Sequence, residues 1–207
     1  MTVPFFFQTL VTGLSSGMIS YMMVAGMSLI ISGMNMVNFG QGAFFVLGTY
    51  LTYTITAHIG FIPSLIIAPL VVGGLGWFVE RAVRPLFGKN MLYIMLLTFG
   101  VAYIVCDGMI MIWGYAIRLM KLPSFLNKSV AIFGIYFPTY YLFMIAVGLL
   151  IAISFWIMMN KTKLGMMMRA IIKDREMVAC LGINVNKLFS IMFMLGTGIA
   201  GLGGVLN

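Results

Sequence analysis

The chain has 207 residues, of which 62% are hydrophobic and only 8% are charged, and its mean hydropathy is +1.12. Soluble proteins carry about 25% charged residues, so this composition excludes a water-soluble globular protein. The net charge of +8 does not indicate nucleic-acid binding, because the first 79 residues contain no Asp, Glu, Lys or Arg and no basic face follows the chain.

Apolar stretches bounded by glycine, proline or charged residues predict about six membrane elements. Spanning a hydrocarbon core takes about 20 mainly apolar residues, and backbone amides in lipid must be satisfied within the segment, which favours helices. The stretches are residues 5–31, 42–58, 62–79, 91–114, 138–159 and 188–207. We therefore predict an all-α polytopic membrane bundle of about six spans, in which residues 1–207 form a single transmembrane domain.

Small residues recur at four-residue spacing in two of these stretches, as Gly13-x-x-x-Gly17 and as Gly196-x-x-x-Ala200-x-x-x-Gly204. Such spacing lets helix backbones approach closely in lipid. Both stretches are predicted to form helix-packing seams.

Residues 32–42 (SGMNMVNFGQG) lie between the first two apolar stretches and are polar and glycine-rich, without a charge. They form either a tight cytoplasmic turn or a break in the helix at membrane depth. Non-helical backbone at that depth is tolerated only where it is buried in protein or lines a wet cavity. The sequence leaves both interpretations open.

Few side chains in the predicted spans can carry chemistry. Asp107 is the one acid inside an apolar stretch, which makes it a functional hypothesis by default, but no second acid, His or Lys in another span completes a proton relay. We favour a structural or pathway-lining role and keep an ion-coupled carrier as an alternative. His58 has no acid or nucleophile near it, Cys106 and Cys180 lack metal-site spacing, and no P-loop motif occurs. We expect neither an enzyme nor a metal or cofactor site in this chain.

Basic residues predict the orientation of the bundle. The segment that follows the third stretch and the segment from residue 161 to 187 hold nine of the twelve basic residues. Alternating spans place these two segments on one side, which the positive-inside rule makes cytoplasmic. Residues 115–137 and the N-terminus are then outside.

The segment 161–187 (KTKLGMMMRAIIKDREMVACLGINVNK) holds eight charged side chains in 27 residues. Its apolar residues recur at helical spacing and predict one short amphipathic helix that ends near Gly182; they are Met167, Ala170, Ile171, Met177, Val178 and Leu181. A helix lying on lipid headgroups is one alternative. Docking to a soluble partner explains the Lys-Asp-Arg-Glu tetrad and the Leu-Gly-Ile-Asn turn better.

Three stretches, in this order, resemble the permease subunits of branched-chain amino-acid importers of the ATP-binding-cassette (ABC) class. They are GMNMVNFGQGAFFVLGTY (33–50), ERAVRPL (80–86) and RAIIKDREMVACLGINV (169–185). The resemblance implies a multi-pass subunit in the inner membrane of a prokaryote. Its expected partners are a second permease subunit, two cytoplasmic ATPases that hydrolyse ATP, an external substrate-binding protein, membrane lipid and a small-molecule substrate.

The resemblance also implies roles for individual residues. Residues 160–187 become a cytoplasmic coupling segment that docks on the ATPase through Arg169, Ala170, Lys173, Asp174, Arg175, Glu176, Leu181, Gly182, Ile183 and Asn184. The translocation pathway is expected to be lined by Asn35, Asn38, Gly40, Gln41, Gly42 and Asp107. The expected substrate is a branched-chain or another amino acid, with urea or a short amide as the alternative.

The chain departs from the family pattern at two places. Cys106 and Asp107 stand where related sequences have uncharged polar residues. The chain also stops at Asn207, partway along an apparent span, where family members continue through further membrane helices. We therefore expect the chain to be truncated at its C-terminus.

Overall fold

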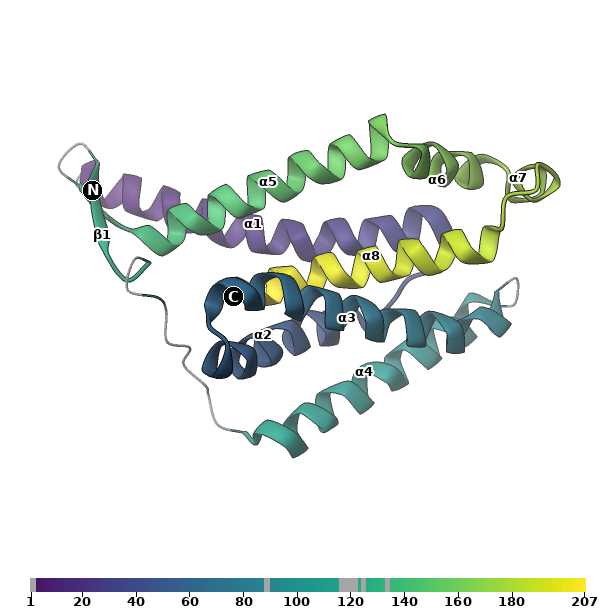
Figure 1. Ribbon diagram of the computed structural model, residues 1–207, viewed down its shortest axis with the longest axis horizontal. Coiled ribbons are helices and arrows are strands. Elements are labelled where there is room, and N and C mark those ends of the chain that lie inside the picture. Colours follow the sequence, from purple (N-terminus) through teal and green to yellow (C-terminus); the bar gives the residue numbers. More distant parts are fainter. Residues whose placement is uncertain (1–2, 88–89, 116–122, 124–125, 133–134) are drawn as a thin grey trace.

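A computed structural model describes residues 3–87, 90–115, 123, 126–132 and 135–207 of the chain. Within these residues the chain is almost entirely helical (Figure 1). The elements are α1 (Val3–Met34), α2 (Gln41–His58), α3 (Phe61–Val83), the 3₁₀ turn η1 (Arg84–Leu86), α4 (Met91–Trp113), the strands β1 (Ser129–Ile132) and β2 (Ile135–Pro138), α5 (Thr139–Lys161), α6 (Lys163–Lys173), α7 (Arg175–Cys180) and α8 (Val185–Val205). The six predicted apolar stretches correspond to α1, α2, α3, α4, α5 and α8.

Five of these helices, namely α1, α3 extended by η1, α4, α5 and α8, are long and apolar enough to cross a membrane. Helix α2 has only 18 residues, and Thr49, Thr52, Tyr53, Thr54 and Thr56 make it more polar than the others. The prediction of a helical membrane bundle is confirmed. The structure divides its six apolar helices into five full-length ones and one shorter one.

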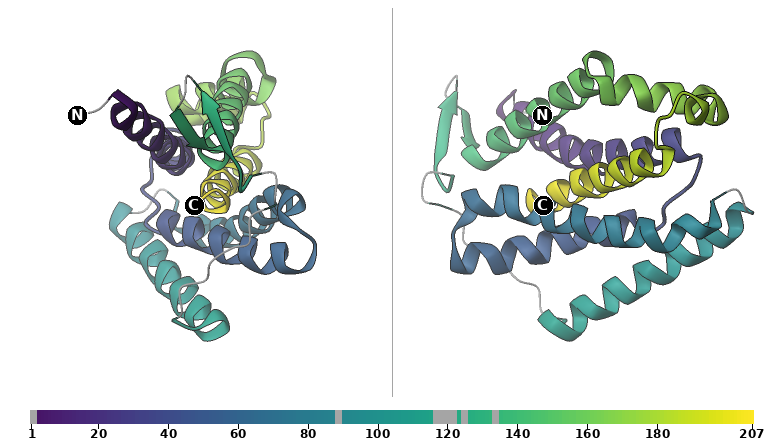
Figure 2. Two further views of the ribbon diagram at one scale, coloured as in Figure 1. Left: turned by 90° about the vertical axis from the view of Figure 1, so that its left-hand side faces the viewer. Right: turned by 45° about the vertical axis from the view of Figure 1, so that its right-hand side comes forward.

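Helix α8 is the centre of the bundle. It packs against α1, α2 and α3, while α5 lies on the outer side of α1 and α4 packs on α2. The left view of Figure 2 looks nearly along the helices and shows α8, in yellow, between these neighbours. The last helix in the sequence is therefore the one most enclosed by the others.

Glycines let the neighbours of α8 come close. A Cβ atom at Gly196 would lie 2.9 Å from Cγ1 of Ile30 in α1, and one at Gly204 would lie 3.0 Å from the backbone carbon of Phe45 in α2. The predicted seam in α8 is thus confirmed. The predicted seam at Gly13 and Gly17 is wrong for the described part of this chain, because a Cβ atom at either position would meet nothing within 4 Å.

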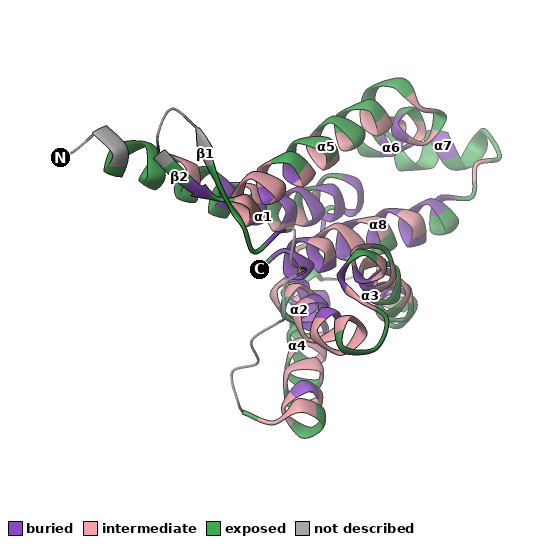
Figure 3. Cartoon of the chain, turned by 60° about the vertical axis from the view of Figure 1, so that its left-hand side comes forward, coloured by how far each residue is buried: buried purple, intermediate pink, exposed green. Residues whose placement is uncertain are grey.

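The outer helices carry many exposed residues, which Figure 3 colours green. Along α4, Leu96, Ile104 and Met111 are each more than 70% exposed. Apolar surface on this scale is unusual in a protein surrounded by water, and it matches the hydrocarbon environment that the composition predicts.

The charged segments gather at one end of the bundle. The C-terminal ends of α1 and η1, the start of α4, the α6–α7 region and the start of α8 all lie there, since residues of each surround one cavity. This confirms that the basic segments after α3 and after α5 share a side. Lys89, Arg118 and Lys121 are also among the basic residues used to predict the orientation of the bundle. They lie outside the described residues.

The opposite end holds the antiparallel hairpin β1–β2, in which Ser129 pairs with Pro138. The hairpin lies beside the start of α1, where the side-chain amide of Gln8 donates to the carbonyl of Tyr136 at 3.3 Å. The sequence analysis did not foresee strands in this segment.

Candidate functional site

Helix α1 ends because Asn35 adopts a left-handed backbone conformation, with φ of 50°. Asparagine tolerates this conformation better than most residues and often terminates helices in this way. The amide of Asn35 still donates to the carbonyl of Ile31 at 2.9 Å. The chain then runs without helical structure to Gly40, so the first part of the predicted break is a real interruption.

A small hydrogen-bonded turn restarts the helix. The side-chain oxygen of Asn38 accepts from the amide of Gly40 at 2.9 Å, and its side-chain nitrogen donates to Oε1 of Gln41 at 3.4 Å. Asn and Asp side chains form such turns readily because they reach the backbone two residues ahead. Asn38 and Gln41 are only 2% and 1% exposed, so their polar groups depend on these internal partners.

The turn is fixed to two other helices. Nε2 of Gln41 donates to the carbonyl of Gly196 in α8 at 3.0 Å, and the amide of Phe39 donates to Oγ1 of Thr98 in α4 at 3.3 Å. Gly196 is the twelfth residue of α8, about 16 Å along that helix at a rise of about 1.5 Å per residue. Helix α2 therefore begins near the middle of the bundle.

This position decides between the two interpretations of residues 32–42. Residues 35–40 return from the end of α1 to the middle of the bundle, as Figure 1 shows, and do not form a tight turn at its end. We call residues 35–41, which join α1 to α2, the break. Met36, Asn38, Gly40 and Gln41 of the break are buried, whereas Asn35 and Phe39 are exposed. Irregular backbone at membrane depth is tolerated where it is buried in protein or lines a wet cavity.

The predicted pathway residues are only partly brought together. Asn35, Asn38, Gly40, Gln41 and Gly42 are neighbours in the break and at the start of α2. Asp107 is exposed on α4, nine residues beyond Thr98, or about 14 Å further along the helix. It does not line the cavity that Asn35 borders beside the break.

The charged segment after α5 folds as two short helices. The prediction of one amphipathic helix is wrong, because Asp174 has an extended backbone with φ of −154° and separates α6 from α7. Its carboxylate accepts from the amide of Met177 at 2.9 Å and so caps α7. The predicted end near Gly182 is confirmed: Gly182 has φ of 78°, and its amide donates to the carbonyl of Ala179 at 3.0 Å.

The separation of α6 from α7 changes which apolar residues are buried. Met168, Ile171 and Val178 are buried, whereas Met177 and Leu181, which the single-helix pattern grouped with Ile171 and Val178 on one apolar face, are exposed. The predicted coupling residues that are exposed are Arg169, Lys173, Asp174, Arg175, Glu176, Leu181, Gly182 and Asn184, while Ala170 and Ile183 are partly buried. They form one protruding end of the molecule, and the guanidinium of Arg169 donates to the carbonyl of Met159 in α5.

One polar cluster was missed by the sequence analysis. Glu80, at 0% exposure, accepts hydrogen bonds from Nε and Nη2 of Arg84 at 3.1 and 2.8 Å, and from Oγ of Ser190 at 2.8 Å. The hydroxyl of Ser190 in turn accepts from Nη2 of Arg84 at 2.6 Å. This cluster fastens the end of α3 to the start of α8. The four-residue spacing of Glu80 and Arg84 was visible in the sequence, but Ser190 is more than a hundred residues away.

One protein family matches almost the whole chain. The family model described as "Branched-chain amino acid transport system / permease component" matches residues 9–207. The chain belongs to this permease family. It is therefore a multi-pass membrane protein and a permease subunit of an ABC importer.

Individual relatives are distant but extend along almost the whole chain. The high-affinity branched-chain amino acid transport system permease protein BraD of Pseudomonas aeruginosa is 24% identical over 97% of this chain and 70% of its own length. The corresponding protein LivH of Salmonella typhimurium is 24% identical over 98% of this chain and 70% of its own. A probable branched-chain amino acid transport permease protein of Methanocaldococcus jannaschii is 24% identical over 89% of this chain and 61% of its own. No solved structure matches the chain significantly.

Proposed function

We propose that this permease subunit imports branched-chain amino acids across the inner membrane of a prokaryote. The names of its relatives support that substrate class. In the proposed assembly the subunit forms half of the pathway beside a second permease subunit. An external binding protein delivers the amino acid, and separate cytoplasmic ATPases hydrolyse ATP.

One structural observation carries the proposed mechanism: the charged α6–α7 segment leads directly into the most enclosed helix of the bundle. Only residues 181–184 separate α7 from α8. Helix α8 is hydrogen-bonded to the break at Gly196 and to α3 at Ser190. A displacement of α7 by a docked ATPase therefore reaches the middle of the bundle through one rigid element.

The α6–α7 segment has the composition of a docking element. Its exposed side chains Lys173, Asp174 and Glu176 carry charges of both signs, which suits a register-setting contact with a partner of mixed charge. The exposed apolar side chain of Leu181 provides an anchor beside it. We assign Arg169, Lys173, Asp174, Glu176 and the turn at Gly182 to the ATPase contact.

The proposed transport step requires that the helices pack in two discrete arrangements. ATP binding closes the ATPases and moves α6–α7, and close-packed helices respond as rigid bodies between discrete arrangements. Because Gln41 bonds to α8, a shift of α8 also shifts the start of α2. The break then opens alternately toward the two sides of the membrane.

The structure does not favour the ion-coupled alternative. Asp107 has no hydrogen bond or ion pair among the described residues and lies apart from the break. A urea or short-amide substrate would use the same ATP-driven mechanism, and no observation in the described residues favours it over an amino acid.

The coupling assignment is tested in proteoliposomes that contain the complete transporter. Glu176→Lys reverses an exposed charge in α7, and we expect it to abolish ATP-driven leucine uptake and weaken binding of the ATPase. The matched control is Lys128→Glu, an exposed charge reversal at the opposite end of the bundle. Uptake that is unchanged by Glu176→Lys contradicts the assignment.

A further inference from the structure

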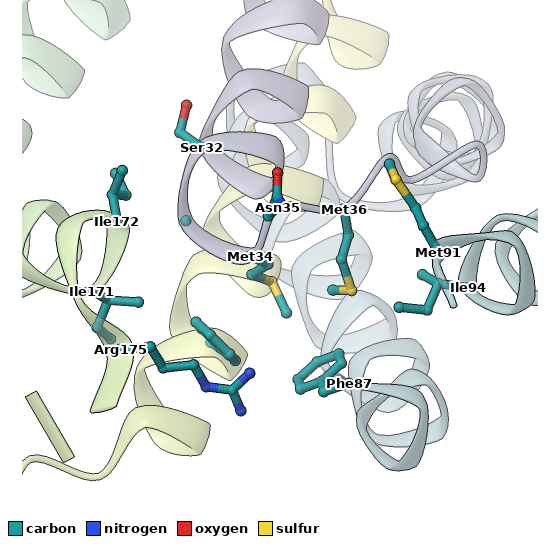
Figure 4. A pocket seen from close by; sticks show the side chains of 12 residues that line it. Ser32, Met34, Asn35, Met36, Phe87, Met91, Ile94, Ile171, Ile172 and Arg175 are labelled. Carbon is teal, nitrogen blue, oxygen red and sulfur yellow. The ribbon is translucent and has the colours of Figure 1, made fainter. Parts of the chain in front are cut away.

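A cavity of about 360 Å³ lies between the break and the coupling segment. It is lined by residues of the end of α1, the break, the start of α4, the α6–α7 region and α8, as Figure 4 shows. Small-molecule sites occupy about 300–1,000 Å³, so the cavity is large enough for an amino acid.

The walls are mainly aliphatic, aromatic and thioether side chains. They come from Met34, Met36, Phe87, Met91, Ile94, Ile171, Ile172 and Phe189. Methionine is flexible and adapts to apolar ligands of different shapes. The walls therefore suit a range of aliphatic side chains rather than one of fixed shape.

One cation projects into this apolar space. The guanidinium of Arg175 lies 5.0 Å from the ring centroid of Phe189, over its face, and Figure 4 shows Arg175 beside Phe87. The four acidic residues of the chain are Glu80, Asp107, Asp174 and Glu176, and none of them lines the cavity. The positive charge of Arg175 therefore has no carboxylate opposite it within the cavity.

Two polar side chains, Ser32 and Asn35, lie on the far side of the cavity from Arg175 in Figure 4. Their oxygen atoms can accept hydrogen bonds. The cavity thus offers a donor for a carboxylate, acceptors for an ammonium group and apolar walls for a side chain.

We propose that this cavity is the last binding site of the amino acid before its release, with the guanidinium of Arg175 bound to the α-carboxylate. This inference rests on the proposed function and assigns Arg175 a role different from ATPase docking. Because Arg175 is the first residue of α7, movement of the coupling segment withdraws the cation from the cavity. ATP-driven movement and release of the substrate are then linked through one side chain.

The test uses the complete transporter in proteoliposomes and measures leucine uptake and binding-protein-stimulated ATP hydrolysis in parallel. Arg175→Gln keeps a polar side chain but removes the charge, and we expect uptake to fall about ten- to a hundredfold, as when a hydrogen bond to a charged group is lost. ATP hydrolysis should stay within about twofold of the wild type, and Arg175→Lys should restore part of the uptake. Lys163→Gln, which removes an exposed charge outside the cavity, is the control and should change neither rate.

A labelling measurement tests binding directly. In a transporter whose permease has Cys106 and Cys180 replaced by serine, we expect leucine to slow maleimide labelling of Ser32→Cys. Leucinamide, which lacks the carboxylate, should not protect, and Arg175→Gln should abolish protection by leucine.

Three outcomes overturn the inference. If Arg175→Gln and the wild type take up leucine equally, the inference is overturned but the proposed function is not. Loss of ATP hydrolysis together with uptake shows that Arg175 acts in docking. Absence of ATP-driven leucine uptake by the wild type refutes the proposed function itself.

Discussion

The close contact between α2 and α8 predicts a large effect of a single methyl group. A Cβ atom at Gly48 would lie 2.9 Å from both the Cα and the carbonyl carbon of Gly201, and nearer still to its carbonyl oxygen. These are backbone atoms that cannot rotate aside, so Gly48→Ala must force the two helices apart. Overpacking of this kind costs about 1–3 kcal/mol. Alanine gains about 1 kcal/mol over glycine in a helix interior, which is too little to offset the upper part of that range.

A matched substitution separates packing from helix propensity. Gly74 is also inside a helix, α3, but a Cβ atom there would meet nothing within 4 Å. We expect Gly74→Ala to leave stability unchanged or to raise it by up to about 1 kcal/mol, the propensity gain alone. Gly48→Ala should therefore be less stable than Gly74→Ala by about 1–3 kcal/mol, the overpacking cost alone.

Thermal unfolding of the detergent-solubilised chain measures both variants. At about 2–4 °C per kcal/mol for a chain of this size, Gly48→Ala should lower the Tm by several degrees relative to Gly74→Ala. Equal Tm values for the two variants would show that α2 does not lie against α8 as described.

Three further predictions concern hydrogen bonds that join distant segments. Gln41→Leu removes the donor to Gly196, and we expect the free energy of unfolding to fall by about 1–3 kcal/mol; an unchanged Tm would refute the role of this contact. Ser190→Ala should destabilise by a similar amount, and its effect should be less than additive with Glu80→Gln because both act on one cluster; strict additivity would show that the cluster is not a unit. Asp174→Ala removes the cap of α7, so hydrogen exchange of the α7 amides should accelerate about fivefold, equivalent to about 1 kcal/mol. Asp174→Asn should keep the slow exchange, and equal rates in the two variants would contradict the capping role.

The helices and the position of the break were predictable from the sequence because both depend on local patterns. Apolar stretches of sufficient length predict membrane helices, and the polar run from Asn35 to Gln41 interrupts them. The depth of the break was not predictable. It follows from the bond between Gln41 and Gly196, two residues 155 positions apart, whose proximity is a property of the folded bundle.

The coupling segment shows a different limit of prediction from sequence. Its apolar spacing is compatible with one continuous helix, but Asp174 interrupts it because an aspartate can cap a new helix with its own side chain. The competing signal was present in the sequence, since Asp is a favoured capping residue. Apolar periodicity alone predicts one helix with Met177 and Leu181 on the same face as Ile171 and Val178, whereas the cap at Asp174 starts a second helix and leaves Met177 and Leu181 exposed.

The buried cluster around Glu80 shows that sequence spacing does not predict whether an ion pair is buried. A glutamate followed four residues later by an arginine is most often an exposed pair on a helix surface. Its burial results from the close approach of α8, and Ser190 satisfies the remaining bonding capacity of the carboxylate. Only the packing of α3 on α8 distinguishes this pair from a surface pair.

The glycines of α8 and its hydrogen bonds have complementary consequences for transport. Close packing makes α8 and its neighbours resist compression, so a displacement that begins at α7 is carried along α8 with little loss. The bond between Gln41 and Gly196 also resists separation, because Gln41 is only 1% exposed and its amide would lose its partner at a cost of about 1–3 kcal/mol. In the transport step that we propose, a shift of α8 therefore carries the start of α2 with it. The proposed point of opening then lies at mid-depth, beside the break, and Arg175 lies at the end of the bundle where the proposed displacement begins.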